Sequence, residues 1–161
     1  MAEQASTQTE SGPRRPQPPR QAGREGGRGQ VDRWKWAREL GEQVKDIETV
    51  KATELVEVAR KAGKQLKLAG LNMNQIRRFL TELREIESAL KHRMGDIDLQ
   101  DRVVLLRPKL AYAAGRQREQ VRPLMEILDP AIRNATSEQG FTNLLRLVES
   151  IVAYHRFYGG E

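Results

Sequence analysis

An apolar rhythm with a period of three to four residues constrains this chain more than any other feature, and it runs from residue 31 to near residue 155. Such spacing places apolar side chains on one face of an α-helix. No stretch combines the strict alternation of a β-strand with a hairpin turn. The sequence therefore predicts an all-α fold, a compact bundle of about five helices joined by short connections.

Each expected helix has its own apolar row. The first, over residues 34–47, is loose, whereas the later rows are regular. The regular rows are Leu55, Val58, Ala59, Ala62, Leu66 and Ala69; Ile76, Phe79, Leu80, Leu83, Ile86 and Leu90; Leu99, Val103, Leu106, Leu110 and Ala113; Val121, Leu124, Met125, Leu128 and Ile132; and Phe141, Leu144, Leu145, Val148, Ile151, Val152 and His155.

Capping signals and a proline mark some helix boundaries. Asn72 followed by Gln75 three residues later is typical of a capping box, and Ser137 suits the start of the last helix. Pro108 interrupts the third regular row. A proline there either kinks one helix or lies in the first turn of a new one.

Residues 1–30 form a separate segment rich in proline, glycine and arginine. The segment has almost no apolar side chain to bury, so it is predicted to be a disordered tail, and residues 31–161 are predicted to form the helical domain. Arginines in such a tail can contact RNA. The alternative is a solvated tail without a role, or in part a remnant of expression.

Composition excludes several kinds of function. The chain has no cysteine and two histidines, His92 and His155, so we expect neither a thiol site nor a metal centre. No phosphate-binding loop, nucleophile elbow or His-x-x-x-His pair is present, so we expect no catalytic residues, no cofactor and no enzyme activity. No apolar run is long enough to span a membrane and none suggests export, so a cytoplasmic protein is expected.

Basic residues recur at intervals of seven, beside the apolar rows. The formal net charge is +6, which alone does not distinguish a nucleic-acid partner from an acidic protein or a need for solubility. Arg77, Arg84 and Lys91 make one such stripe. Arg78 instead precedes Glu82 by four residues, and this spacing predicts an ion pair within the helix.

A second basic stripe consists of Arg102, Lys109 and Arg116, with Tyr112 between the last two. Such donors suit phosphate oxygens, and contacts to them carry no sequence information. The alternative for any single stripe is a solvated, ion-paired surface. His155, at the end of the last apolar row, is interpreted as a buried packing residue rather than a ligand or a base.

Three segments together resemble a known family. They are residues 71–79 (LNMNQIRRF), 106–116 (LRPKLAYAAGR) and 152–160 (VAYHRFYGG). In this order and spacing they resemble the small subunit of type III-A CRISPR effector (Csm) complexes, over about residues 48–160. The segment 1–30 is not part of the family pattern.

The resemblance implies a non-catalytic helical subunit of an antiviral defence complex. Copies of it would stack along the effector filament, beside the large subunit and the backbone subunits, and bind the phosphates of the guide RNA (crRNA) and the target RNA. Carried over to this sequence, the motifs assign RNA binding to Arg77, Arg78, Lys109, Tyr112, Arg116 and Arg156. Arg84 joins them from the stripe alone.

Two alternatives remain open at this point. One is a free-standing helical nucleic-acid-binding protein. The other is a helical enzyme that holds a small anionic substrate, which needs arginines converging on a pocket that also contains a glutamate. The basic stripes border the apolar faces rather than interrupt them, and this placement disfavours the enzyme.

Overall fold

A computed structural model describes residues 32–92 and 98–161. In these two ranges the chain forms seven α-helices and no β-strand, so the all-α prediction is confirmed. The helices are α1 (Lys35–Gln43), α2 (Ala52–Leu68), α3 (Met73–Lys91), α4 (Leu99–Val104), α5 (Leu106–Arg116), α6 (Arg118–Asn134) and α7 (Glu138–Phe157). The tail predicted over residues 1–30 lies outside the described residues.

The predicted number of about five helices was too low, for two reasons. The loose row over residues 34–47 contains a helix, α1, which buries Ala37 and Leu40. The row interrupted by proline is two helices, because α4 ends at Val104 and α5 begins at Leu106. Pro108 lies in the first turn of α5, where a backbone N–H has no partner within the helix, so the second of the two expectations for this proline is confirmed.

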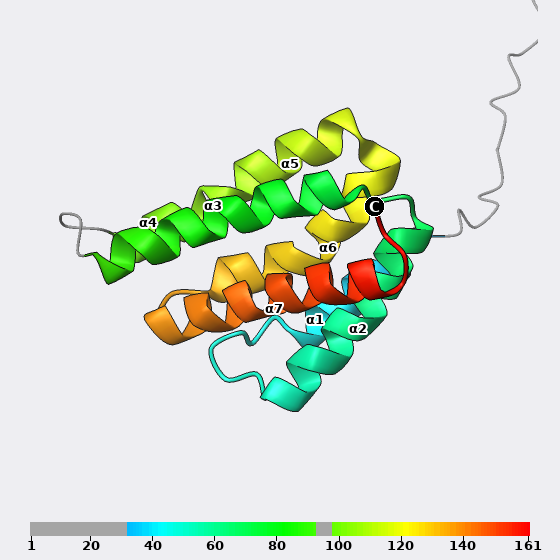
Figure 1. Cartoon of the computed structure of the whole chain (residues 1–161). Helices are drawn as coiled ribbons and strands as arrows, with labels where there is room; N and C mark the ends of the chain where they lie inside the picture. The colour runs from blue at the N-terminus through cyan, green and yellow to red at the C-terminus, as the bar shows by residue number, and fades with distance from the viewer. Residues whose placement is uncertain (1–31, 93–97) are drawn as a thin grey trace, which may run out of the picture. The chain divides into compact units, whose positions relative to one another are not determined.

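The helices of residues 32–161 lie in three layers (Figure 1). The first layer holds α3, α4 and α5, the middle layer holds α6 and α7, and the third holds α1 and α2. Helix α7 packs against α2, α3 and α6, and it buries the core residues Leu144, Leu147, Val148 and Ile151. The core therefore lies on both sides of the middle layer.

The helix caps follow the sequence signals. The Asn72 side-chain oxygen accepts from the Asn74 N–H at 2.8 Å, and the Gln75 side-chain oxygen accepts from the Asn72 N–H at 2.9 Å. This completes the predicted capping box of α3. At the start of α7, Ser137 Oγ accepts from the Gly140 N–H at 3.1 Å, again as predicted.

Two helix crossings are so close that only glycine fits. At the crossing of α2 and α7, a Cβ on Gly63 would lie 2.7 Å from the backbone nitrogen of His155. At the crossing of α1 and α6, a Cβ on Gly41 would lie 2.6 Å from the carbonyl oxygen of Glu126. Pro130 has no N–H to donate to that carbonyl, so α6 offers α1 an oxygen without its usual helical partner.

The segment between α1 and α2 is held by side chains from α6 and α7. Asn143 Nδ2 donates to the Ile47 carbonyl oxygen at 2.8 Å, and Asn134 Nδ2 donates to the Lys45 carbonyl oxygen at 2.8 Å. In return, the Glu48 carboxylate accepts from the backbone N–H groups just before α7. These hydrogen bonds add to the burial of Val44 and Ile47 in the core, and together they fix an irregular segment.

His155 is fully buried in the core, which confirms its interpretation as a packing residue. Its Nε2 donates to the Leu71 carbonyl oxygen at 2.8 Å. Its Nδ1 has no hydrogen-bond partner in the described ranges. Burial, the largest influence, and the nearby Lys67 lower the pKa of His155, while the bond to Leu71 partly opposes them.

The burial of His155 predicts that acid destabilises the fold. Because its pKa is lowered in the folded state, the unfolded chain binds the proton more readily, and the free energy of unfolding falls as the pH drops below the ordinary histidine value of about 6.5. Chemical denaturation at about pH 7.5 and about pH 5.5 measures the difference. In His155→Gln the loss between these pH values should shrink, whereas it should persist in His92→Gln, which changes an exposed histidine. An equal loss in all three chains would contradict the assignment to His155.

Candidate nucleic-acid interface

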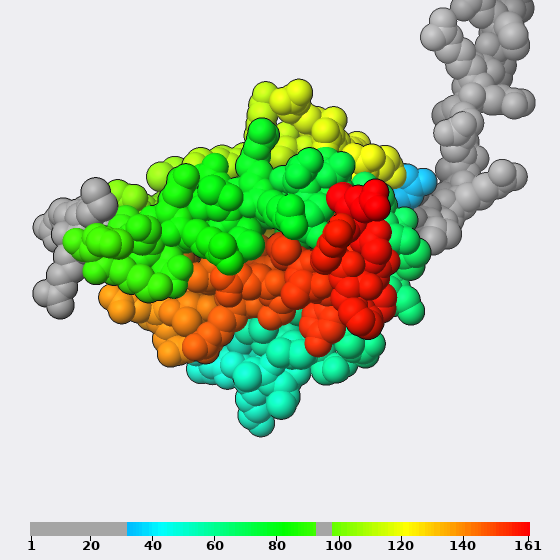
Figure 2. Space-filling view, viewed as in Figure 1, coloured from blue at the N-terminus to red at the C-terminus, as the bar shows by residue number. Residues whose placement is uncertain are grey.

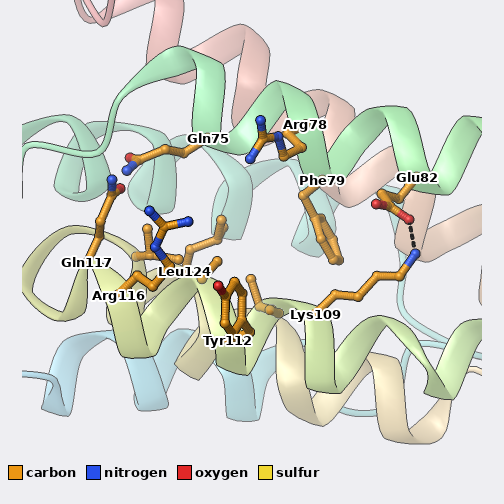
Figure 3. A pocket seen from close by; sticks show the side chains of 12 residues that line it. Gln75, Arg78, Phe79, Glu82, Lys109, Tyr112, Arg116, Gln117 and Leu124 are labelled. Carbon is orange, nitrogen blue, oxygen red and sulfur yellow. Dashed lines mark hydrogen bonds and ion pairs between the residues drawn. The ribbon is translucent and has the colours of Figure 1, made fainter.

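A groove of about 410 Å³ runs between α3 and α5, and the start of α6 forms its floor (Figure 3). Four of the seven residues predicted to bind RNA line it, which are Arg78, Lys109, Tyr112 and Arg116. The other lining residues are Gln75, Phe79, Glu82, Leu110, Ala113, Gln117, Val121 and Leu124. The middle motif and the first motif of the sequence therefore meet at one site.

Arg78 and Arg116 face each other across this groove, Arg78 from α3 and Arg116 from α5 (Figure 3). Neither guanidinium has a carboxylate partner in the part of the chain that the structure describes. The stripes were expected to border separate apolar faces. Because α3 and α5 run side by side, Arg78 and the second stripe meet at one opening, whereas the first stripe does not line it.

The predicted ion pair between Arg78 and Glu82 is wrong. Glu82 instead pairs with Lys109 from α5, across the groove. Residues four apart on one helix are neighbours, but a lysine from a second helix reaches the same carboxylate and competes for it. Glu82 therefore neutralises the charge of Lys109, and Arg78 has no carboxylate partner among the described residues.

Tyr112 lies beside Arg116 and is largely exposed. The Arg116 Cζ is 5.9 Å from the centre of the Tyr112 ring, within reach of a cation–π contact. Tyr112 is 69% exposed, although its ring is large and mostly apolar. The groove therefore combines positive charge with an open aromatic surface.

The structure does not bring the remaining predicted residues to the groove. Arg77 is exposed on α3. Arg84 Nη2 lies 3.2 Å from a carboxylate oxygen of Glu149 on α7, along the seam between α3 and α7 that Figure 2 shows. Arg156 Nη1 donates to the Gly160 carbonyl oxygen at 3.1 Å, near the end of α7. Arg84 is thus part of an ion-paired surface, which the sequence analysis kept as the alternative to RNA binding.

Eight lining residues were not singled out as site residues by the sequence. Gln75 was interpreted only as a cap, and Phe79 and the α6 residues Val121 and Leu124 only as core. Gln117 lies between α5 and α6. The sequence carried no signal for them, because the one-residue connection that places the start of α6 beside the end of α5 is seen only in the structure.

The described residues offer no group of three or more carboxylates and histidines that could hold a metal ion. Within the same ranges, no helix has the length and apolar content needed to cross a membrane. What the groove can do chemically follows from its donors. Two guanidinium groups and two carboxamides can hold an anion and hydrogen-bond a polar edge beside it.

Comparison with known proteins gives one match. A family described as Csm2 Type III-A matches residues 49–161, which include every residue that lines the groove. No curated protein and no solved structure matches the chain.

Proposed function

The chain belongs to the Csm2 Type III-A family and is a small subunit of the type III-A CRISPR effector (Csm) complex, and from this premise we propose that its α3–α5 groove binds the phosphate backbone of RNA. The single observation that carries the proposal is the pair of facing guanidinium groups of Arg78 and Arg116. Guanidinium groups form bidentate hydrogen bonds with phosphate, and both are available because other side chains satisfy the carboxylates nearby.

The further parts of the proposal follow from membership of the complex. The RNA would be the target strand and the guide–target duplex, held in antiviral defence. Copies of the subunit, formed by residues 31–161, would stack along the filament beside the large and backbone subunits and combine their weak interactions into avidity. The subunit itself would catalyse nothing, and it would need no cofactor.

Among the predicted RNA-binding residues, the contacts favour an order. Arg78 and Arg116 come first, with Tyr112 beside them. Arg77 follows them, because it is exposed on the same helix as Arg78 but does not line the groove. Lys109, Arg84 and Arg156 already have partners, so each would have to exchange a protein partner for a phosphate.

The test is the salt dependence of target-RNA binding by the assembled complex. The double variant Arg78→Ala/Arg116→Ala should bind more weakly, and the slope of log affinity against log salt should become shallower by about 0.7 to 0.9 for each phosphate that the variant no longer neutralises. Titration of labelled target RNA at several salt concentrations gives both quantities. The fold should persist, because neither side chain is buried.

The matched control is Lys35→Ala/Lys45→Ala. It also removes two positive charges, but these lie at α1, where they pair with Glu39 and Glu42. Its slope should equal that of the natural chain. If the arginine variant assembles normally and keeps both affinity and slope, the assignment of the groove to phosphate binding is wrong.

A second candidate function is favoured by one observation in the groove. Arg78 and Arg116 converge on an opening that also contains Glu82, which is the arrangement that an enzyme for a small anionic substrate requires. Glu82 is neutralised by Lys109, however, and a base needs a free carboxylate. Turnover of a small anion that is lost in Arg116→Ala would support the enzyme. The free-standing nucleic-acid-binding protein is set aside, since the family is that of a complex subunit.

A further inference from the structure

The α3–α5 groove contains features that phosphate binding alone does not need. We propose that it receives one unstacked nucleotide of the bound RNA strand, with the base against Tyr112 and the apolar floor and the phosphate between Arg78 and Arg116. This inference rests on the proposed function and adds to it a recognition of the base itself.

The floor of the groove is apolar. Phe79, Leu110, Val121 and Leu124 line it, and each is at least nine-tenths buried, so they lie in its floor rather than at its rim. A phosphate in water gains nothing from apolar carbon. A flat aromatic base does gain, because its faces are apolar while its edges are polar.

Tyr112 supplies the stacking surface. At 69% exposure it is one of the most exposed large apolar side chains described, and it lies at the rim rather than in the floor. Exposed aromatic side chains beside cations are the usual platform for bases in single-stranded nucleic acids, and they accept any base because every base has a π-face. Arg116 lies beside the ring and can hold the phosphate of the same nucleotide.

The two ends of the groove differ in polarity (Figure 3). At one end the carboxamides of Gln75 and Gln117 offer both donors and acceptors, which suit the edge of a base. At the other end the pair of Glu82 and Lys109 closes the opening. The volume of about 410 Å³ lies within the range of sites that enclose a small ligand.

The ligand could in principle belong to a strand or be free in solution, and we assign it to the strand. The cations are at the rim and the groove is open on that side, so a backbone can enter and leave while its base turns inward. A free nucleotide has no backbone to continue on either side, so it would not require this open side. The experiment below separates the two sources.

The experiment uses the assembled complex and target RNAs that carry a single abasic site at successive positions. In the natural complex, one abasic position per subunit footprint should weaken binding about tenfold, the usual value for one stacked base. Tyr112→Ala changes every copy in the filament, so it should weaken binding of intact RNA by at least this factor, and binding should no longer respond to the abasic site. Its salt slope should stay unchanged, and Tyr112→Phe should behave as the natural chain.

Two results would overturn the inference. In one, Tyr112→Ala and every abasic position leave the affinity unchanged while Arg78→Ala/Arg116→Ala still flattens the salt slope; RNA binding then stands without a base site. In the other, no abasic position changes the affinity, but a nucleoside monophosphate binds the complex without RNA and loses this binding in Tyr112→Ala and in Arg78→Ala/Arg116→Ala; the groove then holds a free nucleotide rather than a base of the strand. If neither the tyrosine nor the arginine variant changes RNA binding, the proposed function fails as well.

Discussion

Replacing Gly63 with alanine should lower the free energy of unfolding by about 3 kcal/mol, at the upper end for an overpacked core. The new methyl group would lie 2.7 Å from the backbone nitrogen of His155 and 2.9 Å from the carbonyl carbon of Tyr154. Backbone atoms of a helix cannot turn aside as a side chain can. Helix α7 would have to move away from α2, and its apolar row packs on both sides of the middle layer. Urea denaturation followed by circular dichroism measures the loss.

Gly115 is the matched control for this substitution. It also lies in a helix, but a Cβ added there meets nothing within 4 Å. Gly115→Ala should therefore raise the free energy of unfolding by about 0.5 to 1 kcal/mol, since alanine loses less backbone entropy on folding. Opposite signs for the two variants support the close crossing of α2 and α7. A loss of similar size in both would contradict it.

Replacing Glu48 with alanine should lower the free energy of unfolding by about 2 to 3 kcal/mol, as expected for hydrogen bonds to a charged group. The Glu48 carboxylate accepts from the Thr136 N–H at 2.7 Å and from the Ser137 N–H at 2.9 Å. It also accepts from the hydroxyl groups of both residues. Removal would leave the entrance to α7 without these acceptors and release the segment between α1 and α2.

The contribution of Glu48 to the free energy of unfolding should decrease in acid. Burial acts to raise the pKa of Glu48, and the hydrogen bonds from Ser137 and Thr136 outweigh it, so the pKa lies below its ordinary value. The stabilisation is therefore present above the ordinary pKa and is lost as the pH falls through the lowered one. The difference in unfolding free energy between the natural chain and Glu48→Ala should narrow in acid. Glu42→Ala, which removes an exposed partner of Lys45, should cost less than about 1 kcal/mol at any pH.

The regular helices could be predicted from the sequence because their signals are local. The apolar row of α3 and the capping box at Asn72 and Gln75 both depend on spacing within one helix. Helix α1 gave no such regular row, because two of its three buried residues are Ala37 and Gly41, and Gly41 lies against α6. Small residues contribute little to an apolar pattern, yet they allow the closest packing.

The groove could be predicted only in part, because a sequence shows spacing within one helix but not which helices lie side by side. Lys109, Tyr112 and Arg116 lie on one helix, so their common placement was readable from spacing. Which residues stand opposite them depends on which helices are neighbours, and a single sequence does not specify this. The exchange of partners among Arg78, Glu82 and Lys109 is the direct consequence.

The family match begins at residue 49, one residue after Glu48 and after the whole of α1. The compact unit of the fold nevertheless begins at Asp32, and Leu40, Val44 and Ile47 are buried in its core. A fragment of residues 49–161 would lack α1, so it would expose the apolar side of α6. It would also lack Glu48, whose carboxylate accepts from the backbone N–H groups just before α7. The part of the chain that matches the family is thus shorter than the part that folds as one unit. Mutations in residues 32–48 would therefore destabilise the subunit although they lie outside the family match.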